Sequence, residues 1–310
     1  MNKRSAILVA GSETSVGHSI CDELIRQGYK DIVRTDKLNS GLSDRTAVMN
    51  LFKKTKPEYV FMVAGRSGGI GLNRRCPADL MLDNLLVTAN VMSIAQSCGV
   101  AKLLYLASSC VYPRDCPQPM RPDYLFTGPL EPTSEAYAMA KLAGITYCRA
   151  CRRQYGSSFI VAIPSTPFGP RDSLDADNAH VIGSLMVKFC RAKLQGADKV
   201  TLWGTGTPRR DFIYEPDLGR ACIWLMERYD GDDPVNITGT EPISIAQLAE
   251  KISSIAEFRG QIVFDHSYPD GAPLKCLDGS KLFSTGWRPA WDFEDALRAT
   301  FEEVRQCLTC

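Results

Sequence analysis

Short apolar runs alternate with amphipathic stretches through the first half of the chain. The runs are rich in β-branched residues and cover residues 5–10, 31–35, 59–64, 102–107 and 158–163. Between them, apolar positions recur at helical spacing over residues 17–28, 44–55, 77–98 and 134–155. Near-continuous apolar strands that alternate with helices predict a parallel sheet covered on both faces. We therefore expect an α/β fold with a doubly wound parallel sheet of the Rossmann type.

This regular alternation ends near residue 165. A loop rich in Pro, Asp and Asn leads to a helical pattern over residues 180–195. Later patterns predict strands at 200–203, 234–238 and 261–265 and helices at 216–229 and 243–256. We expect a larger domain over residues 1–165 and a smaller α/β lobe over residues 166–310, interleaved with the last elements of the Rossmann sheet.

Composition narrows the classes of function. The 310 residues are 45% apolar and 23% charged, as is usual for a globular enzyme. Lys and Arg number 36 against 35 Asp and Glu, so we expect neither nucleic acid nor a membrane surface as partner. No apolar run approaches the length of a membrane span, and a strand pattern starts within five residues. We expect no signal peptide and a cytoplasmic location.

The 12 cysteines are scattered along the chain. Two C-x-x-C pairs occur, Cys148 with Cys151 and Cys307 with Cys310, but they are far apart in sequence. A chain of this length has its own hydrophobic core and needs no disulfide framework. We therefore expect free thiols and no metal site.

The segment from Gly11 to Ile20 joins the first predicted strand to the first predicted helix. Gly11 permits a tight turn, and Gly17 permits close packing of the helix on the strand. The helix N-terminus offers unpaired N–H groups and partial positive charge to a pyrophosphate. The position of Thr14, between these glycines, usually holds glycine in such turns. The pattern predicts a dinucleotide-binding turn in residues 1–165.

Asp36 stands at the end of the second strand pattern, where a carboxylate would accept hydrogen bonds from the adenosine ribose hydroxyls. Arg34, Lys37 and Arg4 leave open the alternative of a 2′-phosphate. Glu13 and Asp36 together would repel that phosphate. For like charges ~5 Å apart, at an effective dielectric constant of ~20, the cost is on the order of 3 kcal/mol before screening. The charges favour NADH over NADPH.

Tyr137 and Lys141 form a Y-x-x-x-K motif on a predicted helix, and Ser108 ends the fourth predicted strand. A spacing of four places the phenol and the ammonium on one helix face. A phenol with a pKa near ~10 is a poor acid–base catalyst at neutral pH, and a neighbouring cation favours the phenolate. A serine hydroxyl can hold the same substrate oxygen. The set predicts hydride transfer at a carbinol or carbonyl carbon.

With these motifs, the chain resembles the extended short-chain dehydrogenase/reductases, and within them the GDP-fucose synthase family of GDP-4-keto-6-deoxymannose 3,5-epimerase/4-reductases. The combination of "SSCVYP" with "DNAHVI" carries the resemblance, because Y-x-x-x-K marks the whole superfamily. The matching stretches are Gly68–Asn84, Ser108–Pro113, Leu130–Gly144, Arg153–Gly156, Phe168–Asp172, Asp177–Ile182, Leu202–Tyr214 and Pro269–Lys275.

The resemblance implies catalytic roles. Cys110 and His180 would exchange protons at C3 and C5 of a 4-keto sugar, where the ketone makes the neighbouring carbons acidic. Cys110 follows Ser108 by two positions, so we expect both on the same side of an extended chain. Tyr137 would then donate a proton during reduction at C4, with support from Lys141 and Ser108. The cofactor contacts would be Gly11, Thr14, Gly17, Asp36, Ala64, Tyr137, Lys141 and Pro164.

The resemblance also implies contacts with the sugar nucleotide from Asn178, Lys188, Trp203, Arg210 and Lys275. Lys188 and Arg210 suit a diphosphate, the arginine through its bidentate fork. Trp203 would either stack on the base or fill the core of the lobe. In three places the sequence departs from the family pattern. The family carries a glycine at the position of Thr14, an arginine near the position of Glu13, together with NADPH use, and an asparagine at the position of Thr166.

We expect an NAD(P)H-dependent epimerase/reductase that acts on a GDP-4-keto-6-deoxyhexose, as in GDP-L-fucose synthesis, and that forms a homodimer. One alternative is a relative with a single activity, epimerase or 4-reductase, on another GDP-sugar such as a heptose. Another is a non-catalytic protein that senses dinucleotides. The Ser108, Tyr137 and Lys141 set and the Cys110 and His180 pair argue against a sensor, which would not need them.

Overall fold

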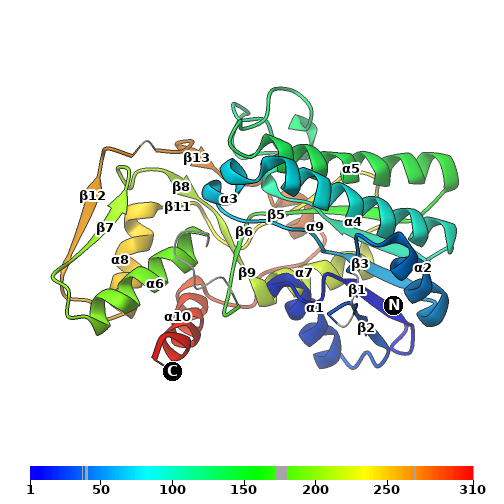
Figure 1. Ribbon diagram of the computed structural model, residues 1–310, viewed down its shortest axis with the longest axis horizontal. Coiled ribbons are helices and arrows are strands. Elements are labelled where there is room, and N and C mark those ends of the chain that lie inside the picture. The colour runs from blue at the N-terminus through cyan, green and yellow to red at the C-terminus, as the bar shows by residue number, and fades with distance from the viewer. Residues whose placement is uncertain (37, 39–40, 172–179, 269, 310) are drawn as a thin grey trace.

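The computed structural model describes residues 1–310 except 37, 39–40, 172–179, 269 and 310 (Figure 1). Its main sheet has six strands in the order β10-β5-β4-β3-β1-β2, and every neighbouring pair is parallel. The strands are β1 (Ile7–Ala10), β2 (Ile32–Arg34), β3 (Tyr59–Met62), β4 (Lys102–Leu106), β5 (Phe159–Pro164) and β10 (Val235–Ile237). The predicted parallel sheet is confirmed.

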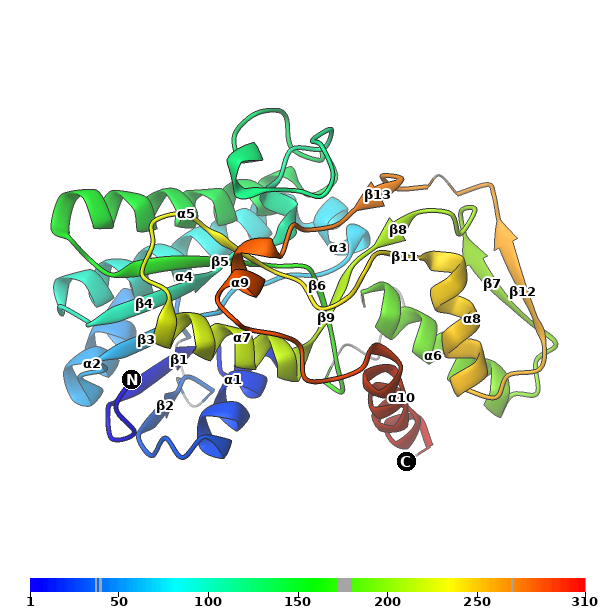
Figure 2. The ribbon, with the colours of Figure 1, turned by 180° about the vertical axis from the view of Figure 1, so that it is seen from behind.

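Helices cover both faces of this sheet (Figure 2). One face carries α2 (Arg45–Thr55), α4 (Pro77–Ser97) and α5 (Glu135–Tyr155), and the other carries α1 (Ser15–Arg26), α7 (Glu215–Arg228) and α9 (Ser280–Ser284). Side chains alternate along the strands, so that Leu8 and Val60 enter the first core while Val9 and Phe61 enter the second. Burial on both faces explains why the strands are apolar throughout.

The N-terminal ends of three helices follow capping rules that can be read from the sequence. Thr14 caps α1 and Asp44 caps α2 through side-chain oxygens that accept backbone N–H groups. Ser244 and Gln247 form a reciprocal capping box at the start of α8 (Ile245–Ile255). These caps fix where the helices begin.

Helix α4 is long and apolar enough to cross a membrane by length and composition, contrary to the expectation that no apolar run approaches that length. It packs against α5 and α2, and it buries Leu80, Val91 and Ile94 in the core. These residues have partners within the protein, whereas Leu82 and Leu86 of the same helix are exposed.

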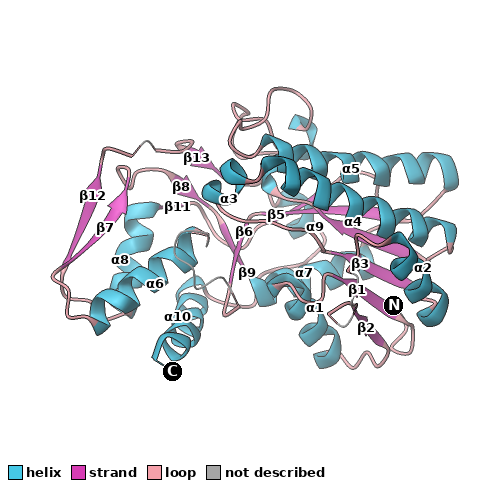
Figure 3. Cartoon of the chain, viewed as in Figure 1, coloured by secondary structure: helices cyan, strands magenta, loops and turns pink. Residues whose placement is uncertain are grey.

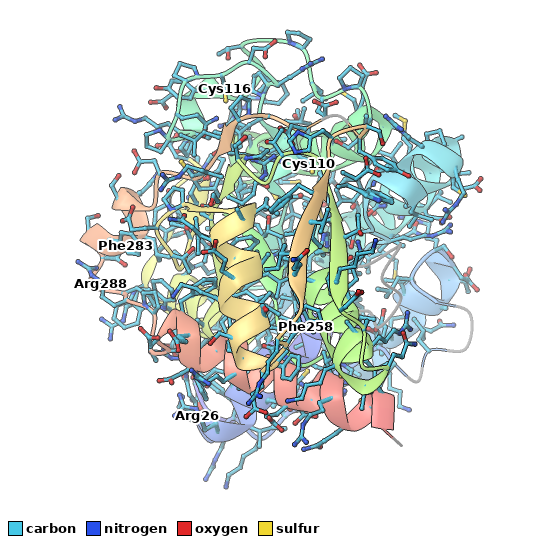
Figure 4. All side chains as sticks on the ribbon, turned by 90° about the vertical axis from the view of Figure 1, so that its left-hand side faces the viewer. Arg26, Cys110, Cys116, Phe258, Phe283 and Arg288 are labelled. Atoms are coloured by element: carbon cyan, nitrogen blue, oxygen red, sulfur yellow. The ribbon has the colours of Figure 1, made fainter. Side chains whose placement is uncertain are left out.

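A smaller unit lies beside the carboxyl ends of the strands (Figures 1 and 3). Its strands are β6 (Thr166–Phe168), β7 (Lys199–Trp203), β8 (Arg209–Arg210), β9 (Phe212–Tyr214), β11 (Ile243–Ser244), β12 (Gln261–Asp265) and β13 (Leu274–Lys275), and its helices are α6 (Val181–Leu194), α8 and α10 (Phe293–Thr309). Phe168, Phe189, Phe212 and Phe301 centre its core, and Phe189 also packs on Phe258 (Figure 4).

Residues after 165 also complete the main sheet, because β10 pairs with β5 and α7 packs against α1. The boundary between residues 165 and 166 stays a prediction. The sequence patterns did not predict α3 (Ile70–Arg75) or the two-residue strands, which are too short to carry a period. Helix α10 was not predicted either, although its apolar residues follow helical spacing.

Candidate active site

The turn after β1 is built around two glycines. Gly11 has φ +96°, and a Cβ atom there would lie 2.5 Å from the backbone nitrogen of Ala64. A Cβ atom at Gly17 would overlap the carbonyl oxygen of Gly11. Gly17 therefore packs the helix against the turn itself, whereas the prediction placed it against the strand. Without a side chain at Gly11, the turn lies directly on Ala64, two residues after β3.

Thr14 closes the turn from within. Its Oγ1 donates to the carbonyl oxygen of Gly11 at 2.8 Å and accepts the backbone N–H of Gly17 at 3.0 Å. The Thr14 side chain thus caps α1 and stabilises the turn at a position where such turns usually hold a flexible glycine. Sequence reasoning treated Thr14 as a departure from the glycine pattern, although threonine before a helix is a common capping signal.

A polar network ties this turn to the end of β2. Thr35 Oγ1 accepts the N–H of Gly11 at 2.9 Å and donates to Glu13 Oε2 at 3.0 Å. Ser12 Oγ accepts the N–H groups of Thr35 and Asp36 at 2.8 and 3.2 Å. Sequence reasoning missed Ser12 and Thr35, because nothing local links the two loops. The network holds the Glu13 carboxylate near the start of the loop that carries Asp36.

Asp36 lies two residues after β2, near the end of the strand as predicted, and it is exposed. Its Oδ2 is 3.6 Å from Arg34 Nε, so the carboxylate already faces a cation. The alternative partner Lys37 lies outside the described residues. Asp36, the predicted ribose acceptor, and Arg34, a predicted alternative partner for a 2′-phosphate, therefore form one ion pair.

The predicted catalytic residues of β4 and α5 come together. Tyr137 and Lys141 are buried one helix turn apart, and Lys141 Nζ lies 5.9 Å from the centre of the Tyr137 ring. Lys141 Nζ donates to the carbonyl oxygen of Leu106 at 3.3 Å. Burial lowers the pKa of Lys141 to about 8. Burial also raises the pKa of Tyr137, and a hydrogen bond with the Ser108 side chain acts against this rise.

Cys110 joins this group by a geometry that the prediction did not foresee. It lies in a 3-10 turn, Ser109–Val111, that Ser108 caps by accepting the Cys110 N–H at 3.4 Å. The expected extended chain is therefore wrong. The thiol is partly buried and close enough to Tyr137 that its charge would raise the pKa of the phenol. The turn brings the thiol, the serine hydroxyl and the phenol to one place.

A buried acceptor without a partner lies at the same sheet edge. The Asn84 side chain donates to the carbonyl oxygens of Arg66 and Leu80 at 2.9 and 2.7 Å, but its Oδ1 has no partner. A Cβ atom at Gly65 would overlap this oxygen and lie 3.3 Å from Lys141 Nζ. A buried unpaired acceptor is costly unless a ligand satisfies it. The Asn84 Oδ1 acceptor and the Lys141 ammonium lie side by side, and together they could accept from and donate to the hydroxyl groups of a dinucleotide's ribose.

The end of β5 lies at the same edge. Pro164 is the last residue of β5, and the buried Ser165 hydroxyl that follows it has no partner either. Together with the glycine turn and Asn84, these groups form a cradle that fits NAD(P). The residues that would hold it are Gly11, Thr14, Gly17, Asp36, Ala64, Tyr137, Lys141 and Pro164.

His180 and Asn178 belong to the segment that leads into the smaller unit. His180 is the partly exposed residue before α6, in extended conformation, and its side chain makes no capping bond. Asn178 lies outside the described residues. The predicted partnership of His180 with Cys110 across a sugar ring remains a prediction.

Arg210 and Lys275 are brought together by strand pairing. They are register partners in the parallel ladder of β8 and β13, so their side chains leave the same face. Arg210 Nη1 donates to the carbonyl oxygens of Arg209 and Ala272, both at 2.7 Å. Two neighbouring cations of this kind suit a diphosphate.

Trp203 does not fill the core of the smaller unit, which removes one of its two predicted roles. Strand β7 alternates exposed and buried residues, and the indole is 61% exposed. It stacks on the ring of Tyr268, with the centroids 4.4 Å apart, and Lys188 Nζ lies 5.5 Å from its centre. Tyr268, which sequence reasoning missed, extends this aromatic surface.

Comparisons with known proteins identify the family and relatives of the chain. The model of the NAD dependent epimerase/dehydratase family matches residues 7–238. The chain is 40% identical over 301 residues to GDP-L-fucose synthase 1 of Arabidopsis thaliana, covering 97% of this chain and 93% of that protein.

Solved structures show the same architecture. A GDP-L-fucose synthetase from Naegleria fowleri, bound to NADP, superimposes with a TM-score of 0.91 at 28% identity, covering 100% of this chain and 95% of that one. A GDP-6-OMe-4-keto-L-xylo-heptose reductase from Campylobacter jejuni has a TM-score of 0.91 at 28% identity, with 99% of both chains covered.

Proposed function

The chain belongs to the NAD-dependent epimerase/dehydratase family, and from this premise we propose that it converts a GDP-4-keto-6-deoxyhexose by 3,5-epimerisation followed by NAD(P)H-dependent reduction at C4. The observation that carries the proposal is the cluster of Ser108, Cys110, Tyr137 and Lys141 at the carboxyl edge of the sheet. A pure reductase has no use for a thiol beside its phenol.

Epimerisation uses proton transfer at the carbons next to the ketone. Cys110 and His180 act as the acid–base pair. One removes a proton from C3 or C5 to leave an enolate, and the other returns a proton to the opposite face. The Ser108 hydroxyl donates a hydrogen bond to the 4-oxygen, where the enolate charge collects.

Reduction uses the buried pair on α5. When bound, NAD(P)H would supply a hydride to C4. Tyr137 donates its proton to the 4-oxygen, and burial keeps the phenol protonated until that step. Lys141, one turn away, stabilises the phenolate that remains.

For the cofactor, the preference we propose is for NADH. The support is the pair of carboxylates, Glu13 and Asp36, at the end of β2, where they would repel a 2′-phosphate. The N. fowleri relative was solved with NADP bound.

For the substrate, Arg210, Lys275 and Lys188 bind the diphosphate and Trp203 stacks on the guanine. The in-register cations and the exposed indole support this assignment. Asn178 contacts the sugar. The C. jejuni heptose reductase keeps a second candidate open, a single-activity enzyme on a GDP-heptose.

A homodimer through α4 and α5 is part of the proposal. Exposed apolar residues lie on both of these neighbouring helices: Leu82, Leu86 and Ala89 on α4, and Met139 and Ala143 on α5. Two such helices on each of two copies bury these residues in a symmetric interface. We also propose a cytoplasmic location, which suits the free thiols of the described cysteines.

Proton exchange tests the function directly. The protein is incubated with GDP-4-keto-6-deoxymannose in D₂O without reduced cofactor, and deuterium at C3 and C5 is read by NMR. Wild type and Tyr137→Phe are expected to incorporate deuterium, whereas Cys110→Ser is not. When NADH and pre-epimerised substrate are supplied, Cys110→Ser is expected to reduce it and Tyr137→Phe is not. No exchange in the wild type would refute epimerisation and leave the single-activity reductase.

A further inference from the structure

A buried carboxylate lies directly behind the proposed diphosphate site. Asp211 follows Arg210 and is 4% exposed. Its Oδ2 accepts the backbone N–H of Leu277 at 2.9 Å and the hydroxyl of Thr238 at 2.8 Å. Burial raises the pKa of this carboxyl to about 6. A buried carboxylate is costly, and the mechanism above does not use it.

The hydrogen bond to Leu277 fixes the segment that carries Lys275. Strand β13 pairs with β8 only at Leu274 and Lys275. Asp211, which follows β8, extends that attachment by two residues through its side chain. Without it, the register of Lys275 against Arg210 depends on this two-residue ladder and on two bonds just before it, from the Arg209 N–H to the carbonyl oxygen of Pro273 at 2.8 Å and from Arg210 Nη1 to that of Ala272 at 2.7 Å.

The other side of the segment is held by the loop that follows the Cys110 turn. The Met120 N–H donates to the carbonyl oxygen of Cys276 at 2.8 Å, and the Asp278 N–H donates to that of Met120 at 2.9 Å. The segment therefore runs between the β8 strand and the Met120 loop, at the junction of the two units (Figure 2).

Buried Asn236 extends this connection to the catalytic turn. Its Nδ2 donates to the carbonyl oxygens of Met120 and Asp278 at 2.9 and 3.1 Å. Its Oδ1 accepts the hydroxyl of Tyr112 at 2.6 Å, and Tyr112 stands two residues after Cys110. Continuous hydrogen bonds thus join the catalytic turn to the strand that carries Lys275.

We propose that Asp211 is a positioning residue for sugar-nucleotide binding: it sets β13 so that Lys275 lies level with Arg210 and both cations meet the diphosphate. The inference rests on the proposed function, because it takes these two residues as the diphosphate site. Asp211 touches neither the substrate nor the cofactor, so its effect falls on binding of the GDP group.

The experiment compares Asp211→Ala and Asp211→Asn with a matched pair, Asp217→Ala and Asp217→Asn. Asp217 is also a buried carboxylate that fixes backbone, since it accepts the N–H groups of Ala290 and Trp291 at 2.9 and 3.2 Å. That segment holds none of the proposed substrate residues. Thermal unfolding establishes which variants are folded, and calorimetry then gives the Kd for GDP, with steady-state KM and kcat for reduction.

Asp211→Ala is expected to raise the Kd for GDP and the KM for the sugar nucleotide about tenfold, with kcat within about twofold and the KM for NADH unchanged. Asp211→Asn keeps an acceptor without the charge, so a rise of about threefold is expected. The Asp217 variants are expected to lower Tm and leave the Kd for GDP unchanged.

The inference would be overturned if folded Asp211→Ala had the same Kd for GDP as the wild type. It would also be overturned if the Asp217 variants raised the Kd for GDP as much as the Asp211 variants do. A wild type that binds GDP but turns over no 4-keto sugar would refute the proposed function. The inference would still hold if Asp211→Ala then weakened GDP binding. A wild type that binds no GDP would overturn both.

Discussion

Gly11→Ala tests the cofactor turn, and the structure offers a matched control. Gly11 has φ +96° and Gly28 has φ +84°, so alanine at either position meets the same unfavourable backbone conformation. At Gly28 the new methyl group has nothing within 4 Å. At Gly11 it lies 2.5 and 2.6 Å from the backbone nitrogen and Cα of Ala64. Comparison of the two variants therefore isolates the steric overlap from the backbone strain.

The magnitudes follow from these distances. Left-handed backbone costs an L-residue about 1–2 kcal/mol, and alanine recovers about 0.4–1 kcal/mol by restricting the unfolded chain. Gly28→Ala should therefore lower the free energy of unfolding by about 1.6 kcal/mol or less. Overpacking against rigid backbone adds about 1–3 kcal/mol at Gly11. Gly11→Ala should thus lower the free energy of unfolding by about 1–4.6 kcal/mol, which is less than the free energy of unfolding of a typical domain.

The same overlap weakens cofactor binding. Relief of the contact needs a shift of the turn by roughly 1 Å, which brings the methyl group to normal van der Waals separation. A hydrogen bond from the turn to a phosphate is lost over such a distance, and bonds to charged groups contribute about 1.5–3 kcal/mol each. Gly11→Ala should therefore raise the Kd for NADH at least about tenfold, whereas Gly28→Ala should leave it unchanged.

Urea unfolding followed by tryptophan fluorescence measures the stabilities, and calorimetry measures the Kd for NADH and NADPH. The reasoning is refuted if folded Gly11→Ala binds NADH within twofold of the wild type. It also fails if both alanine variants lose the same stability, since the overlap with Ala64 would then have no cost.

Three further predictions concern charge and assembly. Because burial lowers the pKa of Lys141 to about 8, the ammonium beside Tyr137 is lost as the pH rises through 8. The kcat for reduction should therefore fall about tenfold per pH unit above pH 8. Lys141→Arg, if active, should move this decline to higher pH. If the decline stays near pH 8 in that variant, a group other than Lys141 causes it. Asp36→Asn should raise the kcat/KM ratio of NADPH over NADH about tenfold, because it removes a repelling charge; an unchanged ratio means that Asp36 does not set the preference. Leu86→Glu should halve the mass measured by analytical ultracentrifugation. Its control is Lys53→Glu on the exposed face of α2, and Leu86→Glu should lower Tm no more than this control does. If Leu86→Glu remains a dimer, the interface lies elsewhere.

The sequence determined the features that depend on neighbours along the chain. Apolar runs predicted the parallel sheet, and the four-residue spacing placed Tyr137 and Lys141 on one helix face, as the structure has them. The capping of α1 by Thr14 could also have been predicted from the sequence, because a cap depends only on the three residues that follow it. Such local periods and caps act over one or two turns, so they can be read without knowing the fold.

The tertiary structure decided what depends on register between distant segments. Lys275 stands level with Arg210 across 65 residues only because β13 pairs with β8, and Thr35 reaches Gly11 only because β2 lies beside β1. The 3-10 turn at Cys110 overturned the extended chain expected there. No local pattern specifies these contacts. Strand pairing, loop closure and burial select them together, since each is stable only when the others have formed.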